Sequence, residues 1–465
     1  MKTKKTKKTK KTKRALAMVV VVITLMSLFT IPTFALKDGD WEFQLLNNEA
    51  MITGYTGEKG DIVVPGMLYG VNVTSMSCDW NVFNGATSIT FPGTMKKIDT
   101  LAIYGWDELE KLTFGEGVES ICGCSIQKFN NLRSVSLPST LKVLGGHMFN
   151  NTPSLKEISI PASVKEIGWM AFNNSGLERV DLSGLTELTL KDSTFSNCHN
   201  LTEIILPSDL KEISLGFAQY CDKLEKIDIP SSVTSIGPKA FDGTALKEII
   251  LPAGLKELHP STFKDTKLRE VIIPYGTTYL GYGGGSIYGV FDGCKELEAV
   301  YVPDTVTSMG AGIVGACPNA IIYCSEGSFA EKHCSKNKIS YLTDNSVNSS
   351  VHVYYNGKRI SFHNYGQNPE ILEGRTLVPL RSIFEAMGAT VEWDEATSTA
   401  IAKRGDVEIK ITIGANEVYK NGKAISVDVP AQIIGERTMV PVRVIAEAFD
   451  AKVDWNDNGI VTITE

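Results

Sequence analysis

The sequence predicts a mainly β solenoid followed by a small α+β domain, and three observations lead to this fold class. Across residues 91–303, one phrase returns every 22 to 24 residues, with one longer gap. The repeat stops after Leu342, where a short polar stretch follows. Beyond that stretch, a different motif is duplicated at an offset of 62 residues. A fixed period of roughly 20 to 50 residues is typical of repeat architectures, which present one long surface rather than one pocket.

Each repeat unit, or rung, indicates strands and turns rather than helices. In LEKIDIP (residues 224–230), apolar and polar residues alternate as in a strand with one inward face. Pro230 ends this strand, because proline cannot donate to a continuing ladder. A second apolar pair and a glycine turn follow, and Phe241 fills the core. We expect a stacked aromatic spine made by Phe149, Phe172, Phe195, Phe217, Phe241, Phe263 and Phe291.

The repeat resembles the BspA-like leucine-rich repeats of secreted and surface bacterial proteins. That family's pattern, L-x-x-I-x-I-P-x-x-V-x-x-I-G-x-x-A-F, is met most fully at residues 155–172 and 224–241. The sequence departs from it at residues 115–116, 182–183 and in the insertion 281–289. The resemblance implies a role in adhesion and in binding host or matrix proteins.

Residues 1–35 are expected to be a signal peptide. A lysine-rich stretch precedes an apolar run that ends in the small-residue pattern before Ala35, so cleavage after Ala35 is predicted. The run is about long enough to span a bilayer, so an uncleaved anchor is the alternative. In both cases we expect the rest of the chain to be secreted or extracellular, in the medium or associated with the cell envelope, with no membrane contact beyond the leader.

The remaining domain boundaries follow from where the repeat begins and ends. An open stack of strands leaves unpaired ends, which need caps. The predicted parts are an N-terminal cap at residues 36–74, a leucine-rich repeat solenoid at 75–342 with a C-terminal cap at 320–342, a linker at 343–350 and a second domain at 351–465.

The second domain contains two copies of one motif. GRTLVPLRSIFEAMGATVEWD (residues 374–394) matches ERTMVPVRVIAEAFDAKVDWN (residues 436–456). Each copy predicts a strand, a short helix with a proline in its first turn, and a second strand. Asn-Gly pairs at residues 356–357 and 421–422 are typical of hairpin turns. We expect an α+β domain with an antiparallel sheet packed on helices.

The motif R-T-[LM]-V-P-[LV]-R, followed by V-[ED]-W, resembles the copper amine oxidase N-terminal, or stalk, domain of secreted Gram-positive proteins. The oxidase chemistry resides in a separate catalytic domain, so the resemblance implies an accessory module that attaches or spaces a partner domain at the cell envelope. Arg381 and Arg443 are either a ligand clamp or i,i+4 partners of Glu385 and Glu447.

Charge argues against several classes of partner. The formal net charge is −7, and residues 1–35 hold nine Lys or Arg and no acid, so the remainder is near −16. An acidic secreted chain is a poor candidate for binding nucleic acid or an anionic membrane.

The nine cysteines favour packing over metal binding. One frame of the repeat, which carries Thr or Ser in other rungs, holds Cys198, Cys221, Cys294 and Cys317. A small core side chain accounts for this frame, and disulfides between rungs are the alternative in an oxidising compartment. Cys122 with Cys124, and the cysteines of residues 317–334, lack the ligand spacing of zinc sites. We expect no metal and no other cofactor.

The outward-facing positions of the strands supply the candidate binding site. The residues that follow the middle apolar position form a lane that is hydroxylic early and apolar late. We expect a partner-binding patch at Ile205, Asp228, Glu248, Ile250, Glu270, Ile272 and Tyr301. Two alternatives stay open: β-branched and aromatic residues suit any strand, or the next domain covers these side chains.

The insertion at residues 279–288, rich in glycine and tyrosine, is expected to be a bulged edge loop whose tyrosines contact a partner. It lacks the strand, helix and Lys-Ser/Thr of a phosphate-binding loop, which argues against a nucleotide site.

These features favour a binding protein over an enzyme. We expect the solenoid to engage a protein or glycan and the C-terminal domain to attach or space it. The alternative is an envelope module that holds the producer's own wall polymer. We expect no catalytic activity, because H-E-x-x-H, G-x-S-x-G and P-loop motifs are missing and the six histidines are scattered. The sequence sets neither the partner's identity nor the oligomeric state.

Overall fold

The computed structural model describes residues 35–98, 106–121, 129–281, 288–362, 367–372, 374–456 and 459–465. Two compact units divide the chain, residues 1–176 and 177–465. Three predicted features lie outside the described residues: the signal peptide up to residue 34, the pair Cys122 and Cys124, and residues 282–287 of the edge loop.

A five-stranded sheet occupies the predicted N-terminal cap. In sheet order its strands are β1 (Leu36–Asp38), β2 (Trp41–Leu46), β3 (Glu49–Tyr55), β6 (Val71–Met76) and β5 (Met67–Leu68). Phe43, Ile52 and Val73 bury their side chains completely. The 3₁₀ helix η1 (Trp80–Phe83) follows, and the Asp79 carboxylate accepts a hydrogen bond from its Asn81 N–H at 3.0 Å.

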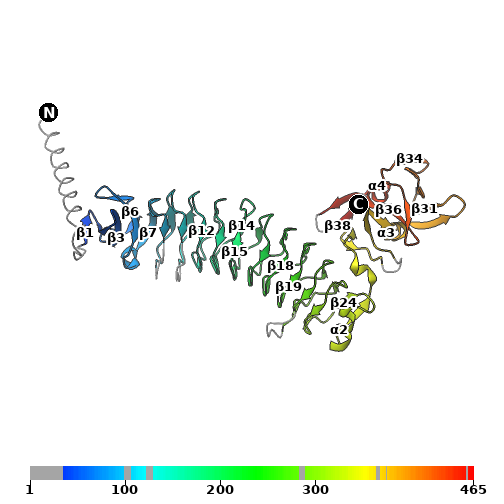
Figure 1. Cartoon of the computed structure of the whole chain (residues 1–465), viewed down its shortest axis with the longest axis horizontal. Coiled ribbons are helices and arrows are strands. Elements are labelled where there is room, and N and C mark those ends of the chain that lie inside the picture. The colour runs from blue at the N-terminus through cyan, green and yellow to red at the C-terminus, as the bar shows by residue number, and fades with distance from the viewer. Residues whose placement is uncertain are drawn as a thin grey trace. The chain divides into compact units, whose positions relative to one another are not determined.

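Two parallel ladders run through the rungs of the first unit (Figure 1). The first ladder pairs β4 (Gly60–Val63), β7 (Ala86–Phe91), β9 (Lys111–Phe114) and β11 (Ser134–Ser136) in this order. The second pairs β8 (Lys97–Ile98), β10 (Ser120–Ile121), β12 (Val143–Leu144) and β13 (Glu166–Ile167). The strands of neighbouring rungs thus satisfy each other's backbone hydrogen bonds. A single rung cannot satisfy its own.

Ladders of the same two kinds run through the second unit. On one side β14 (Arg179–Asp181) pairs with β16 (Glu203–Ile205), and β20 (Glu270–Ile272), β22 (Ala299–Tyr301), β24 (Ile321–Cys324) and β25 (Tyr341–Thr343) pair in that order. The other side holds β15 (Thr189–Leu190) and the paired series β17 (Glu212–Ile213), β18 (Ser235–Ile236), β19 (Glu257–Leu258), β21 (Tyr279–Leu280) and β23 (Ser308–Met309).

The predicted aromatic spine is present, but one ring breaks its stacking. Phe241 stacks on Phe263 with ring centroids 5.6 Å apart and an interplanar angle of 8°. Phe217 instead meets Phe195 at 85° and Phe241 at 79°. The reason is a shift in frame: Phe217 follows its ladder residue Ile213 by four positions, whereas Phe241 follows Ile236 by five. The expectation that Phe217 stacks in the common frame is therefore wrong.

The loops that carry these rings share a pair of left-handed residues, three and seven positions after the last residue of the short strand. The pairs with positive φ are His147 and Asn151, Met170 and Asn174, Ser193 and Asn197, Gly216 and Tyr220, Lys239 and Gly243, and Ser261 and Asp265. Left-handed backbone is costly for most residues, and Gly, Asn and Asp tolerate it best. Backbone bonds between loops offset the cost, as from Phe195 N–H to Phe217 O at 2.9 Å.

The small-residue frame of the repeat is a buried hydrogen-bonding position. The Thr244 hydroxyl donates to Phe241 O of its own rung at 2.8 Å. The thiols of Cys221 and Cys294 instead donate to a phenylalanine carbonyl of the preceding rung, at 3.1 and 3.0 Å. Among the described residues, no two cysteines are joined by a disulfide. Packing therefore accounts for this frame without disulfides.

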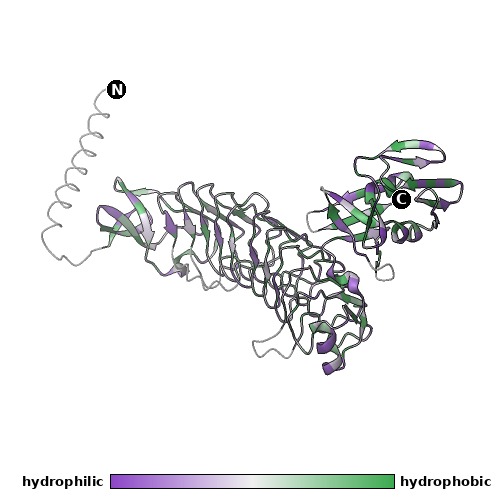
Figure 2. Ribbon diagram, turned by 45° about the vertical axis from the view of Figure 1, so that its right-hand side comes forward, coloured by the Kyte–Doolittle hydropathy of each residue, from purple (hydrophilic) through white to green (hydrophobic). Residues whose placement is uncertain are grey.

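The solenoid ends in a capped helix and an ordered turn. Helix α2 (Phe329–Asn337), mostly hydrophilic (Figure 2), begins at Ser328, whose hydroxyl accepts from Glu331 N–H at 3.1 Å. The predicted linker contains the 3₁₀ helix η2 (Asn345–Asn348). The Asn348 side-chain amide donates to Asp304 at 2.8 Å and accepts from its backbone N–H at 2.8 Å. Residues 343–350 are thus held against the last rungs and are not an open tether.

Three sheets and two helices build the C-terminal domain. The first sheet orders β27 (Lys358–Arg359), β26 (His352–Tyr355), β38 (Ile460–Thr464) and β37 (Lys452–Trp455); the second orders β28 (Glu370–Leu372), β29 (Arg375–Pro379), β36 (Arg437–Pro441) and β35 (Gln432–Ile434). The third is a meander of β30 (Thr390–Asp394), β31 (Thr399–Arg404), β32 (Val407–Thr412), β33 (Glu417–Lys420) and β34 (Lys423–Ser426). Helices α3 (Leu380–Ala386) and α4 (Val442–Ala448) bury Ile383 and Ile445 in the shared core.

The duplicated motif gives strand, helix, strand in both halves, as predicted. Both Asn-Gly pairs have positive φ at each residue and close the hairpins β26–β27 and β33–β34. The sheets are antiparallel except for the pair β26–β38, which is parallel. In the central pair β29–β36, Val378 lies opposite Val440, its own equivalent at the offset of 62. An antiparallel strand pair can place equivalent residues opposite each other only about a local two-fold axis.

Candidate binding surface

The predicted lane lies on the outer face of the first ladder in the second unit. Strand register places Ile205 beside Asp181 and Tyr301 beside Ile272, while the residues between lane positions, such as Val271, are buried. Among the seven predicted residues, Asp228, Glu248 and Ile250 are exposed, and Ile205, Glu270, Ile272 and Tyr301 are half-buried. We call these seven residues the outer lane.

Six outer-lane residues line two hollows. Ile205 and Asp228 lie in a groove of about 510 Å³ between the rungs of residues 202–208 and 226–231. Glu248, Ile250, Glu270 and Ile272 line a second pocket of about 330 Å³. We call these the rung groove and the lane pocket. The seventh outer-lane residue, Tyr301, lines neither hollow.

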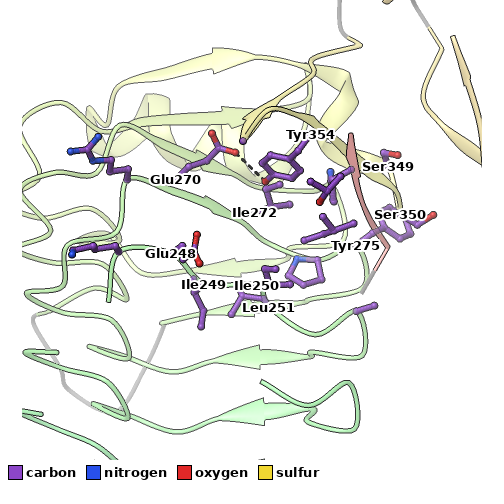
Figure 3. A pocket seen from close by; sticks show the side chains of 18 residues that line it. Glu248, Ile249, Ile250, Leu251, Glu270, Ile272, Tyr275, Ser349, Ser350 and Tyr354 are labelled. Atoms are coloured by element: carbon purple, nitrogen blue, oxygen red, sulfur yellow. Dashed lines mark hydrogen bonds between the residues drawn. The ribbon is translucent and has the colours of Figure 1, made fainter. Parts of the chain in front are cut away.

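The other wall of the lane pocket comes from the end of the linker and from the C-terminal domain. Ser349, Ser350 and Tyr354 face the isoleucine side chains across the pocket (Figure 3), and buried His352 lines it too. Tyr275, half exposed, follows the strand end of its rung and lines the same pocket. These lining residues were missed from sequence, because the repeat gives no signal for what packs on its outer face.

Two side-chain contacts hold this wall in place. The Tyr354 hydroxyl donates to Glu270 Oε1 at 3.3 Å (Figure 3). The Arg359 guanidinium lies 4.1 Å from the centroid of the Tyr301 ring. Glu270 and Tyr301 are thus engaged within the chain. For these two residues, the contacts support covering by the next domain.

Burial changes the acid–base behaviour of the pocket. It raises the pKa of Glu270, although Arg359 and the Tyr354 hydrogen bond act in the opposite direction. Burial also raises the pKa of Tyr301 to about 12. Burial and then the Arg359 charge lower the pKa of His352 to about 3, so its imidazole is neutral at physiological pH. Its Nδ1 is buried with no hydrogen-bond partner among the described residues.

The solenoid residues that line the lane pocket include two cations. Lys247 pairs with Glu225 at 2.7 Å, and Arg269 pairs with Glu296 at 3.4 Å. These pairs are exposed and contribute little to stability. The arrangement is an apolar floor with a polar rim, which suits recognition of an amphipathic group.

Two further findings cover the described part of the chain. No group of three or more His, Cys, Asp and Glu side chains there could hold a metal ion. Over the same ranges, no helix has the length and apolar character that a membrane span requires. Of the edge loop, Tyr288 is exposed and Lys264 lies 5.3 Å from the centroid of its ring.

Comparison with known families identifies both parts of the chain. Residues 77–178 and 177–284 match the BspA type leucine-rich repeat region, in six copies. Residues 354–464 match the copper amine oxidase N-terminal domain. The protein therefore combines a BspA-type leucine-rich repeat solenoid with a copper amine oxidase N-terminal domain, as both motifs predict.

Solved structures of leucine-rich repeat proteins are similar to the chain at low identity. One from Bacteroides ovatus is 20% identical, with a TM-score of 0.47, over 63% of this chain and 71% of its own. A leucine-rich cell surface protein from Faecalibacterium prausnitzii is 22% identical, with a TM-score of 0.35, over 67% and 99%. The pneumococcal vaccine antigen PcpA is 16% identical, with a TM-score of 0.42, over 68% and 100%. A search of curated proteins found no match.

Proposed function

We propose that this protein is a secreted or cell-surface binding protein whose outer lane engages a protein or glycan partner, with the C-terminal domain as an attachment or spacing module. The BspA-type repeats support a binding role, because the resemblance to that family implies adhesion. The signal-peptide pattern supports secretion. Both modules matched by family models are accessory in character, so the proposal includes no catalytic step.

One observation carries the proposal: Ile250 is 41% exposed at the mouth of the lane pocket. Its neighbour Ile272 lines the same pocket, and Asp228 lines the rung groove. A partner that inserts an apolar side chain between these isoleucines would bury surface that water now covers. Central apolar contacts of this kind supply most of the energy of typical interfaces.

The test is Ile250→Ser in the chain from residue 36, assayed by surface plasmon resonance against matrix proteins and immobilised glycans. We expect the variant to bind the wild-type partner at least about tenfold more weakly, since tenfold is about 1.4 kcal/mol. Leu215→Ser is the matched control, because Leu215 is 42% exposed and lies outside both hollows. Unchanged binding by Ile250→Ser, with both variants folded, would contradict the proposal.

The alternative function is retention of the producer's own wall polymer. It is favoured by two exposed tryptophans on the C-terminal domain, Trp393 and Trp455. Binding of the wild-type chain to purified cell walls, with no binding to matrix proteins, would support this function over adhesion through the lane.

A further inference from the structure

The C-terminal domain carries two matched grooves that neither the solenoid nor the lane pocket involves. The first groove, of about 520 Å³, is lined by Arg381, Trp393, Ile433, Arg437 and Thr438. The second, of about 640 Å³, is lined by Arg443, Trp455, Ile371, Arg375 and Thr376. Each residue of the first set lies 62 positions from its counterpart in the second. The same five residue types therefore line both grooves.

The local two-fold axis explains this match. Each groove takes its tryptophan and the start of its helix from one half of the domain and its edge hairpin from the other half. The axis between Val378 and Val440 exchanges the halves, so it converts one groove into the other. Trp455 Nε1 donates to Thr376 Oγ1 of the opposite half at 3.1 Å, which fixes the indole in its groove.

Both grooves expose aromatic and aliphatic surface to solvent. Trp393 and Trp455 are each 41% exposed, and Ile433 and Ile371 are 53% and 63% exposed. A single exposed tryptophan is ordinary, but here an exposed tryptophan and an exposed isoleucine line the same groove, and this arrangement occurs twice at equivalent positions. The Arg443 guanidinium lies over the Trp455 ring, 5.1 Å from its centroid. The indole surface that stays open offers a flat platform for an apolar face of a ligand.

Carboxylates accompany the arginines of each groove. Glu392 and Glu436 line the first groove. In the second groove, Arg375 Nε donates to Asp428 at 2.7 Å, and Arg443 lies 3.8 Å from Glu447. Two cations and two acids leave each groove close to neutral, which disfavours a ligand that is purely anionic or cationic. Such a groove offers both donors and acceptors, which hydroxyl groups can use at the same time.

We propose that the two grooves are equivalent binding sites for a neutral glycan, each taking one or a few sugar units of a repeating polymer. The tryptophan stacks on the C–H face of a sugar ring, and the arginines and carboxylates bond its hydroxyls. Two similar sites on one domain favour a polymer that presents the same unit twice, because the second contact is intramolecular. The inference deepens the attachment role in the proposed function and rests on it to that extent.

The experiment is calorimetric titration of the chain from residue 36 with chitohexaose, cellohexaose and maltohexaose, and with polygalacturonate as an acidic probe. We expect one neutral hexasaccharide to bind at two sites per chain. Trp393→Ala and Trp455→Ala should each leave one site, and the double variant none. On the insoluble polymer, loss of either site should weaken retention at least about tenfold through lost avidity. Tyrosine at both positions should restore binding in part.

Two controls separate this inference from the proposed lane function. Trp169→Ala removes an exposed tryptophan of the solenoid and should bind as wild type. Ile250→Ser should also keep glycan binding, so a failed lane does not imply failed grooves. Three results would overturn the inference: no neutral hexasaccharide bound at millimolar concentration, binding that survives the double substitution, or binding of polygalacturonate alone.

Discussion

The two parts of this protein are both built by duplication, but the solenoid repeats by translation and the C-terminal domain by rotation. In the ladder, Ile272 lies beside Tyr301, its equivalent in the next rung, with both strands running the same way. In the domain, Val378 lies opposite Val440 with the strands reversed. Translation leaves an open series in which each rung can carry a different outward side chain. Rotation closes after two copies and produces a matched pair of sites.

The largest expected effect comes from breaking the translational packing at its centre. Phe241 is fully buried between Phe217 and Phe263. Phe241→Ala should lower the free energy of unfolding by about 3–5 kcal/mol, because it opens a cavity that neighbouring rungs cannot fill. Urea unfolding monitored by circular dichroism measures it. Phe329→Ala, at an exposed ring of α2, should cost about 0.5 kcal/mol or less; equal losses would refute the spine's role.

A second prediction concerns the pH dependence of stability at the lane pocket, where the C-terminal domain contacts the solenoid. The pKa of His352 is about 3 in the folded chain and close to 6.5 when unfolded. As pH falls below 6.5, the unfolded state binds a proton that the folded state does not, so stability falls by up to about 1.4 kcal/mol per pH unit. Urea unfolding at pH 7.5, 6 and 5 should show this slope, and His352→Leu should reduce it.

The neighbouring acid provides the control of opposite sign. Burial raises the pKa of Glu270, so its contribution to stability is present at low pH and is lost as pH rises through its folded pKa. Glu270→Gln removes that loss while the His352 slope persists. If His352→Leu and the wild type share one pH profile, the imidazole does not titrate as the structure indicates.

A smaller effect is expected from Arg359, whose guanidinium lies over the ring of Tyr301, the last residue of the outer lane. Arg359→Ala removes the guanidinium that lies 4.1 Å from the Tyr301 ring centroid. The expected cost is about 1–2 kcal/mol, the range for a partly desolvated cation–π pair. Hydrogen exchange should quicken in β22 and in β26. Lys264→Ala, which removes a cation 5.3 Å from the exposed Tyr288 ring, should leave both strands unchanged.

The smallest effect is expected from the helix pairs of the rotational repeat. Arg381 lies 3.6 Å from Glu385, and Arg443 lies 3.8 Å from Glu447, both exposed. Glu385→Gln should therefore change thermal stability by less than about 0.5 kcal/mol. A larger loss would show that the arginines serve the fold, and the grooves would then lose two of their ligand-binding side chains.

The sequence predicted the fold more completely than it predicted the binding sites. Rung period, strand ends and hairpin turns are local, so alternation, Pro230 and the Asn-Gly pairs predict them directly. The frame shift at Phe217 was visible in the spacing from Ile213, but one ring orientation cannot be derived from a pattern of letters. Periodicity placed Ile250 and Ile272 on one face because strand side chains alternate.

What the sequence could not supply were the contacts between distant segments. The lane pocket needs β26, and no repeat pattern indicates where a following domain docks. Each tryptophan groove joins residues from different halves, as Trp455 and Thr376 show. The offset of 62 was the available signal, because it shows that Trp393 and Trp455 occupy equivalent positions. A buried strand residue at this position would not need to be tryptophan. Their exposure is a property of the fold and could be known only from it.

The pair of left-handed residues in the phenylalanine loops has a consequence for how this molecule can change length. Because each turn of the coil leaves and re-enters the ladders at the same backbone angles, a whole turn can be gained or lost while the remaining ones close up again. A single inserted residue would instead shift the following residues out of the register that the parallel ladders require. The length of the solenoid can thus change in steps of one turn while both of its ends stay the same.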